Sequence, residues 1–261
     1  MIRGKVIDSE TKKPVPFAHV FVKNGEFGAV TKSDGIFVLN LSPSENPDSL
    51  TITSLGYHNT TVAANSDDFI TIYLEPRIYQ MSDIAVNAVG ANKKDTLGTI
   101  SGPGSAFGWP SFGAKRTEGD MHSSFAIPVK WMHDVPFTID KARIRIAKAS
   151  VDSLIFRFRF LSKDSVTSLP DSNLVNENIV VSKTQSSGWI EFELEPGKYW
   201  FHEKEFFLVF DWMSDGQSRK YIAPMFSHKS GSGSYFLYKH ATDSNWSRQE
   251  KELIYTIFIR Y

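Results

Sequence analysis

Turn-forming residues divide this chain into short stretches in which apolar and polar side chains alternate. The alternation has the two-residue period of a β-strand, and Gly, Pro, Asn, Asp and Ser interrupt it at roughly the 8 to 12 residue spacing of sandwiches and barrels. Helical periodicity is almost absent. The sequence therefore predicts an all-β protein.

The length of the chain suits two domains. At 261 residues it exceeds the size of one small sandwich, and the alternation stops in a segment rich in glycine and poor in large apolar side chains. We predict an N-terminal β-sandwich at residues 1–88, a Gly-rich linker at 89–108 and a C-terminal β-sandwich at 109–261.

The composition excludes several classes of function. Lys plus Arg and Asp plus Glu both number 29, so no net charge favours nucleic acid or a membrane surface. The absence of Cys excludes disulfides, thiolate catalysis and Cys-based zinc sites. No stretch reaches the roughly 20 apolar residues of a transmembrane helix. We interpret Met1 as standing where a signal peptide was removed, with a cytoplasmic protein as the alternative.

No catalytic motif stands out. The seven His contain no pair at zinc-ligand spacing, and the segment 202–205 only begins like H-E-x-x-H. The segment 108–113 is one residue too long for a nucleophile elbow, and no Gly-rich phosphate loop is present. Two carboxylates could still converge for glycoside hydrolysis. We expect a protein that is not an enzyme and has no cofactor.

The residues at the end of the apolar run 205–212 could form a metal site or plain turns. Asp211 and the Asp215-Gly216 pair lie where carboxylates and carbonyls could gather around a calcium ion. Asp-Gly pairs also form plain turns. We expect turns and no metal.

The first 86 residues carry a spaced series of small, turn-forming and β-forming residues. Its members are Gly4-Lys5-Val6-Ile7-Asp8, Pro14-Val15-Pro16-Phe17-Ala18-His19-Val20, Gly28-Ala29-Val30-Thr31, Asp34-Gly35-Ile36-Phe37-Val38-Leu39 and Leu55-Gly56-Tyr57. The series resembles the carboxypeptidase-regulatory-like domain, a transthyretin-like β-sandwich. The resemblance implies a non-catalytic accessory module, found on secreted peptidases and on Gram-negative outer-membrane receptors, and it carries over no zinc ligand.

Two runs in the second domain resemble another group of proteins. Gly188-Trp189-Ile190-Glu191-Phe192-Glu193-Leu194 and Glu205-Phe206-Phe207-Leu208-Val209-Phe210-Asp211-Trp212 are similar to the C-terminal sandwich of uncharacterised Gram-negative cell-envelope proteins and to jelly-roll carbohydrate-binding modules. Together the resemblances imply a transthyretin-like Greek key at residues 1–88 and a jelly-roll-like sandwich at 109–261. They also imply export to the periplasm, the outer membrane or the cell surface.

All six Trp lie in the second domain. Trp189 and Trp212 lie within apolar runs, so we expect them to pack in the core. Trp109, Trp131 and Trp246 lie instead among Gly, Pro, Ser, Asn, His and Lys, where loops are expected. Loop-borne aromatic rings can stack on sugars, so these three are the candidate ligand-binding residues, with core packing as the alternative.

Charged residues alternate with apolar ones in three runs of the second domain. They are Arg143 and Arg145, Arg157 and Arg159, and Glu191, Glu193 and Glu195. We expect the apolar partners to face the core and the opposite charges to share one outer face as cross-strand pairs. The alternative is an arginine-lined groove for an acidic glycan.

These observations predict a non-catalytic secreted or cell-surface protein of a Gram-negative bacterium. The expected partner is a glycan or an envelope protein, recognised by the C-terminal domain. The alternative is a structural module that docks to an outer-membrane receptor or surface complex by β-strand pairing. Neither interpretation fixes the oligomeric state.

Overall fold

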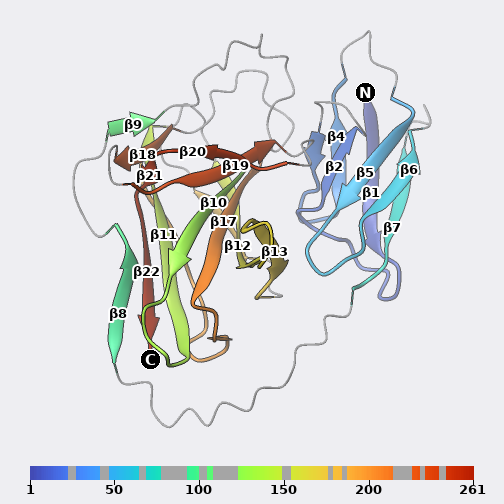
Figure 1. Ribbon diagram of the computed structural model, residues 1–261. Coiled ribbons are helices and arrows are strands. Elements are labelled where there is room, and N and C mark those ends of the chain that lie inside the picture. The colour runs from blue at the N-terminus through green and yellow to red at the C-terminus, as the bar shows by residue number, and fades with distance from the viewer. Residues whose placement is uncertain are drawn as a thin grey trace.

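The structure is a computed structural model (Figure 1) that describes residues 1–22, 28–41, 47–64, 69–77, 93–99, 105–107, 123–148, 154–175, 179–183, 187–213, 225–229, 233–240 and 245–261. Every regular element in these ranges is a β-strand. The strands form two sandwiches with separate cores, which confirms the prediction of an all-β chain with two β-sandwiches. Nowhere in these ranges does a helix occur with the length and apolarity that crossing a membrane requires.

The N-terminal sandwich has a three-stranded sheet of order β4-β1-β7 and a four-stranded sheet of order β3-β2-β5-β6. β1 pairs antiparallel with β4 and parallel with β7. The strands are β1 (Ile2–Asp8), β2 (His19–Val22), β3 (Gly28–Val30), β4 (Ile36–Leu39), β5 (Ser49–Thr53), β6 (Thr60–Ala63) and β7 (Ile70–Leu74).

Alternation along each strand builds the core of this sandwich. On β1, Val6 is fully buried whereas Arg3 is exposed, as the two-residue period requires. The buried apolar residues are Ile2, Val6, Val15, Ala18, Val20, Ala29, Phe37, Leu39, Leu50, Ile52, Ile72 and Leu74.

Two glycines let the strands of this sandwich approach closely. A Cβ on Gly4 would lie 2.3 Å from the carbonyl oxygen of Ile70 and 2.7 Å from the ring of Phe37, too close for any side chain. Gly35 has a φ of +76°, and a Cβ there would lie 2.6 Å from the carbonyl oxygen of Val6. Only glycine satisfies both positions.

The C-terminal sandwich has a seven-stranded and an eight-stranded sheet. The first has the order β13-β12-β17-β10-β19-β20, with β14 also on β12, and its strands are β10 (Ser123–Lys130), β12 (Leu154–Lys163), β13 (Pro170–Asn173), β14 (Ile179–Lys183), β17 (Glu205–Met213), β19 (Phe236–His240) and β20 (Ser247–Gln249).

The second sheet has the order β21-β18-β11-β22-β8. Off this path, β15 and β16 pair with β11, and β9 pairs with β18. The strands are β8 (Lys94–Gly98), β9 (Ser105–Phe107), β11 (Phe137–Lys148), β15 (Gly188–Glu193), β16 (Trp200–Phe201), β18 (Met225–Lys229), β21 (Glu252–Leu253) and β22 (Tyr255–Arg260).

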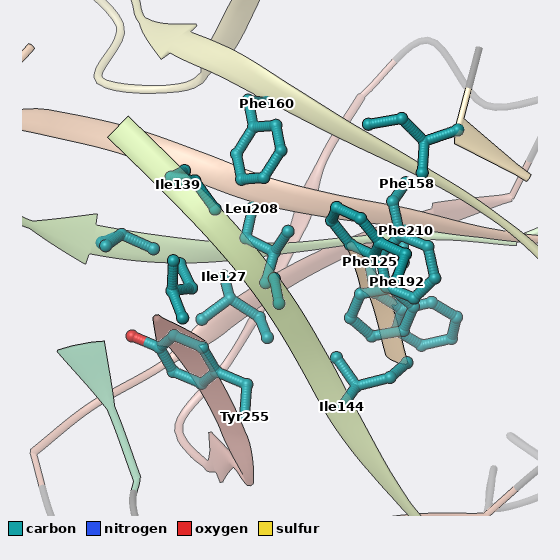
Figure 2. Close-up of a cluster of buried hydrophobic side chains, with 14 of the residues drawn as sticks. Phe125, Ile127, Ile139, Ile144, Phe158, Phe160, Phe192, Leu208, Phe210 and Tyr255 are labelled. Carbon is teal, nitrogen blue, oxygen red and sulfur yellow. The ribbon is translucent and has the colours of Figure 1, made fainter. Parts of the chain in front are cut away.

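Phenylalanine dominates the space between these two sheets (Figure 2). Phe158 of β12 and Phe192 of β15, from opposite sheets, have ring centroids 4.5 Å apart. Phe125 and Phe210 stack at 5.0 Å within one sheet. Aromatic pairs add about 0.5–1.5 kcal/mol each beyond the area that they bury.

Parts of the predicted linker form two strands, β8 and β9, and β9 pairs with β18. β8 lies inside residues 89–108 and pairs antiparallel with β22, from Thr256 opposite Gly98 to Arg260 opposite Lys94. Its side chains stay half-buried or exposed, so main-chain bonds to β22 hold it in the sheet. The composition of this segment did not predict the strand, because a scarcity of large apolar side chains indicates low burial but says nothing about main-chain pairing.

Candidate functional site

Six outward side chains of β11, β15 and β22 form a surface that we call the Arg143 face. Along the ladder between β11 and β15, Arg143 lies opposite Glu191 and Arg145 opposite Trp189. On the other side of β11, Lys141 lies opposite Phe258. The face comprises Lys141, Arg143, Arg145, Trp189, Glu191 and Phe258.

Strand alternation explains why these residues point outward. On β11, Ile144 and Ile146 are buried between the sheets, so Arg143 and Arg145 project from the opposite side. On β15, Ile190 is fully buried, and its neighbours face outward. All six members of the face are half-buried.

Arg143 is held between two aromatic rings. Its guanidinium carbon lies 4.1 Å from the ring centroid of Trp189 and 5.1 Å from that of Phe258. Such cation–π contacts are worth about 0.5–1 kcal/mol at exposed sites and more when water is excluded. The rings therefore fix the plane of the guanidinium before any ligand arrives.

The Nε donor of Arg143 finds no acceptor in the described part of the chain. This nitrogen is also buried. The nearest carboxylate on the face, Glu191, forms its ion pair with Lys141 at 2.9 Å instead. A buried donor without a partner costs about 1–3 kcal/mol, so its presence in a well-packed sheet needs an explanation. Because this Nε is buried, an anion arriving from outside would have to bond to the terminal nitrogens of the half-buried side chain.

On β11 and β15 the opposite charges share one outer face, as predicted, but Glu191 pairs with Lys141 and Arg145 lies opposite Trp189. For Arg157 and Arg159 the prediction is wrong. Those two residues belong to β12, which pairs with β13, β14 and β17 in the other sheet, so β12 and β15 touch only through their core-facing side chains. Their apolar neighbours face the shared core from the opposite side, so their charges lie on the other outer surface of the sandwich.

On that other surface, Asp211 is surrounded by three donors. Arg157 Nε, Arg159 Nη2 and Ser124 Oγ each lie 2.7 Å from its carboxylate, and Asp211 is 1% exposed. Burial by itself raises the pKa of Asp211, but the charges of Arg159 and Arg157 outweigh burial and hold that pKa well below its usual range.

This network leaves Asp211 without a free oxygen for calcium. One carboxylate oxygen accepts from Ser124 and Arg159, and the other accepts from Arg157. Asp215-Gly216 lies outside the described residues. Within the described ranges, no group of three or more His, Asp and Glu side chains is placed to hold a metal ion.

The structure places Trp131 in the core. It is 3% exposed, its Nε1 donates to the carbonyl oxygen of Val135 at 2.7 Å, and its ring packs against Phe137 and Tyr261. Trp131 lies in the connection between β10 and β11, as predicted, and its main-chain N–H donates to the carbonyl oxygen of Lys204 at 2.8 Å, but its ring is buried. An indole covered in this way offers no free face to a sugar.

Trp246 lies half-buried on the outer surface of the seven-stranded sheet. It packs against the cluster of Ala126, Leu161, Phe207, Val209 and Leu237, and Lys239 Nζ lies 4.8 Å from its ring centroid. It remains a candidate for binding. Trp109 lies outside the described residues.

Trp189 is the functional candidate that we missed. We assigned it with Trp212 to the core, and only Trp212, 4% exposed, lies there. The available signal was strand parity, because Trp189 and Glu191 are two residues apart and must share a face. The apolar run around Trp189 concealed this relationship.

Comparison with known proteins identifies the N-terminal part. Residues 2–86 match the family model described as the CarboxypepD_reg-like domain, which confirms that resemblance. No curated protein sequence matches the chain.

Two solved structures are similar to parts of the chain. One contains the cysteine protease and lectin-like domains of a surface-layer-associated protein of Clostridium difficile, with 9% identity, a TM-score of 0.38, and coverage of 54% of this chain and 32% of that one. The other is a clostridial cysteine protease after propeptide cleavage, with 8% identity, a TM-score of 0.44, and coverage of 64% and 40%. The chain thus spans well under half the length of either structure.

Proposed function

We propose that this chain, whose residues 2–86 form a carboxypeptidase-regulatory-like domain, is a non-catalytic binding protein that holds acidic glycans on the Arg143 face. One observation carries the proposal: the Arg143 guanidinium lies against the rings of Trp189 and Phe258, while the neighbouring carboxylate of Glu191 pairs with Lys141. We further propose that the protein acts after export, at the envelope of a Gram-negative bacterium.

A carboxylate is the ligand group that suits this arrangement. The guanidinium presents parallel N–H donors in a plane, and a carboxylate accepts two of them at once. Arg145, two residues along β11, adds positive charge on the same face. Because the aromatic rings already hold the Arg143 side chain, little conformational entropy is lost when the ligand binds.

The electrostatics of the described carboxyl groups support binding over hydrolysis. Glycosidases need one carboxylic acid with a raised pKa. In the described ranges, each Asp or Glu whose pKa departs from its ordinary value has it lowered, and these are Asp8, Asp134, Asp164, Glu205 and Asp211. Their neighbours stabilise the ionised form, which cannot donate a proton at neutral pH.

Calorimetric titration with polygalacturonate tests the proposal, with a neutral galactan as the control polysaccharide. We expect binding to the acidic polymer alone, weakened by salt, because screening acts on exposed charges. Arg143→Ala should lower the affinity at least about tenfold, which corresponds to about 1.4 kcal/mol.

Arg248→Ala is the matched control variant. Arg248 stacks on Tyr235 with its guanidinium carbon 3.7 Å from the ring centroid, but on the other sheet and paired with Glu250. Its removal should leave polygalacturonate binding unchanged. Trp246→Ala tests the rival surface: binding lost there and retained in Arg143→Ala would refute the assignment to the Arg143 face.

A further inference from the structure

β7 is an edge strand whose outer side carries no partner over residues 70–74 among the described residues. Directly after it, the carbonyl of Glu75 accepts from the N–H of His58 at 2.9 Å, which closes the edge there. β7 is the last strand of the order β4-β1-β7 and pairs only with β1, from Ile70 opposite Gly4 to Leu74 opposite Asp8. An open edge of this kind presents a row of main-chain donors and acceptors.

The pairing with β1 shows which groups face the open edge. In a parallel pair, residues that bond to the neighbouring strand alternate with residues whose amide and carbonyl point away. The carbonyl of Leu74 accepts from the N–H of Ser9 at 2.9 Å, so residues 70, 72 and 74 bond to β1. Thr71 and Tyr73 therefore direct their main-chain groups to the open edge.

The sequence of this edge lacks the features that prevent strand addition. Natural edge strands carry charged residues, Pro or a bulge. Residues 69–74 read Phe-Ile-Thr-Ile-Tyr-Leu, without a charge, a Pro or a Gly, and the ladder with β1 has no register shift. Phe69 and Tyr73 are 51% and 52% exposed, so large apolar surface lies directly beside the open main chain.

The outer face next to this edge is positively charged. On β1, Arg3 and Lys5 point to the same side as Thr71 and Tyr73, with Lys5 directly opposite Thr71. Lys12 Nζ lies 5.2 Å from the ring centroid of Tyr73. Because Thr71 is short, the Lys5 side chain can extend across it toward an added strand. None of the outward positions of β1, β4 and β7 in the three-stranded sheet is acidic.

We propose that β7 accepts an extended segment of a partner protein that adds to the sheet as a fourth strand. Its main chain would pair with Thr71 and Tyr73, as in β-augmentation. Its outward side chains would be acidic, to complement Arg3, Lys5 and Lys12, and the alternate ones apolar, to continue the core face of Ile72 and Leu74.

This occupant fits the edge better than two others do. A lipid surface could match the aromatic rings and cations, but it would leave the main-chain groups of Thr71 and Tyr73 unpaired. A second copy joined through its own β7 would bring another Arg3 and Lys5 to the same face and supply no acidic side chain there.

A labelled, capped nine-residue peptide in which Val and Glu alternate is the probe, titrated into the full chain by fluorescence anisotropy. We expect binding, together with slower amide hydrogen exchange at residues 70–74. Thr71→Pro removes the outward donor without breaking bonds to β1, and it should weaken binding at least tenfold. Thr71→Val, the matched control, keeps that donor and should bind as the wild type does.

Two further comparisons separate charge and main-chain pairing from other effects. Lys5→Glu should weaken the Val/Glu peptide and favour a Val/Lys peptide. A Val/Glu peptide with N-methylated central residues should fail to bind wild-type protein, which tests pairing even where Thr71→Pro does not fold. Arg143→Ala should leave peptide binding unchanged, so this proposal and glycan binding can fail separately.

Any of three outcomes overturns the proposal. The first is unchanged exchange at residues 70–74 in the presence of saturating peptide. The second is equal binding of the Val/Glu and Val/Lys peptides. The third is that Thr71→Pro leaves peptide binding intact but abolishes another association of the protein. That association would be either dimerisation without peptide or adsorption to anionic phospholipid vesicles.

Discussion

The phenol of Tyr57 donates a hydrogen bond of 2.9 Å to the carboxylate of Asp8, 49 residues earlier in the chain. Asp8 also accepts from the main-chain N–H of Glu10 and of Thr11, at 2.9 and 2.7 Å. One carboxylate at the end of β1 thereby holds both its own turn and the distant Leu55-Gly56-Tyr57 segment.

This contact predicts how the stability of the N-terminal sandwich changes at high pH. Burial, and then the bond to Asp8, raises the pKa of Tyr57 from 10.0 to about 12. Because the folded-state pKa is raised, protonated Tyr57 contributes its full stabilisation below about pH 10. That contribution is lost as the pH rises to about 12. Tyr57→Phe should lower stability at pH 7 by about 1–2 kcal/mol and flatten the loss between pH 10 and 12. Urea unfolding at several pH values would measure both effects.

At low pH the stability depends on Asp8, whose pKa is shifted in the opposite direction to that of Tyr57. The N–H of Thr11, followed by the Tyr57 hydroxyl, lowers the pKa of Asp8 against its burial. A lowered folded-state pKa stabilises the fold above the ordinary aspartate pKa and loses that contribution as the pH falls through the folded value. Asp8→Asn should therefore destabilise the protein at pH 7 and much less at pH 3. An equal loss at both pH values would contradict this account.

The network around Asp211 predicts that the near-isosteric substitution Asp211→Asn greatly lowers the free energy of unfolding. Asp211→Asn removes the charge that pairs with Arg157, whose side chain is 8% exposed and whose pKa burial already lowers. Leaving a buried arginine without its counterion costs about 3–5 kcal/mol. Glu205→Gln is the control, since the half-buried Glu205 pairs with Lys130 and Lys163 near the surface and should matter far less. Chemical denaturation that ranked the two variants equally would contradict the buried network.

Substitutions of Trp131, which is buried, and Trp189, which faces outward, should have opposite effects on stability and on glycan binding. Trp131→Ala opens a cavity beside Phe137 and should cost about 3–5 kcal/mol in stability. Trp189→Ala removes an outward ring and should change the melting temperature little while weakening polygalacturonate binding. A melting temperature that fell as far for Trp189→Ala as for Trp131→Ala would place Trp189 in the core after all.

The positions of these tryptophans show what the sequence could predict. The two-residue period and the turn residues identified both sandwiches, because burial on one face of a strand leaves a local pattern. The partner of each strand leaves none: nothing near Arg157 indicates that it meets Asp211, 54 positions later, and not Glu191. The candidate site depends on such pairings, so the stacking of Arg143 on Trp189 required the structure.

The terminal strand gives the last prediction. β22 lies between β11 and β8 and contributes Tyr255, Ile257 and Ile259 to the core of the C-terminal sandwich. Deleting residues 254–261 would unpair both neighbours, so we expect insoluble or protease-sensitive protein. Ile257→Val, which removes one buried methylene, should fold and lose about 0.5–1.5 kcal/mol. A truncated chain that stayed soluble with the wild-type melting temperature would mean that β22 is dispensable, contrary to its central place in the sheet.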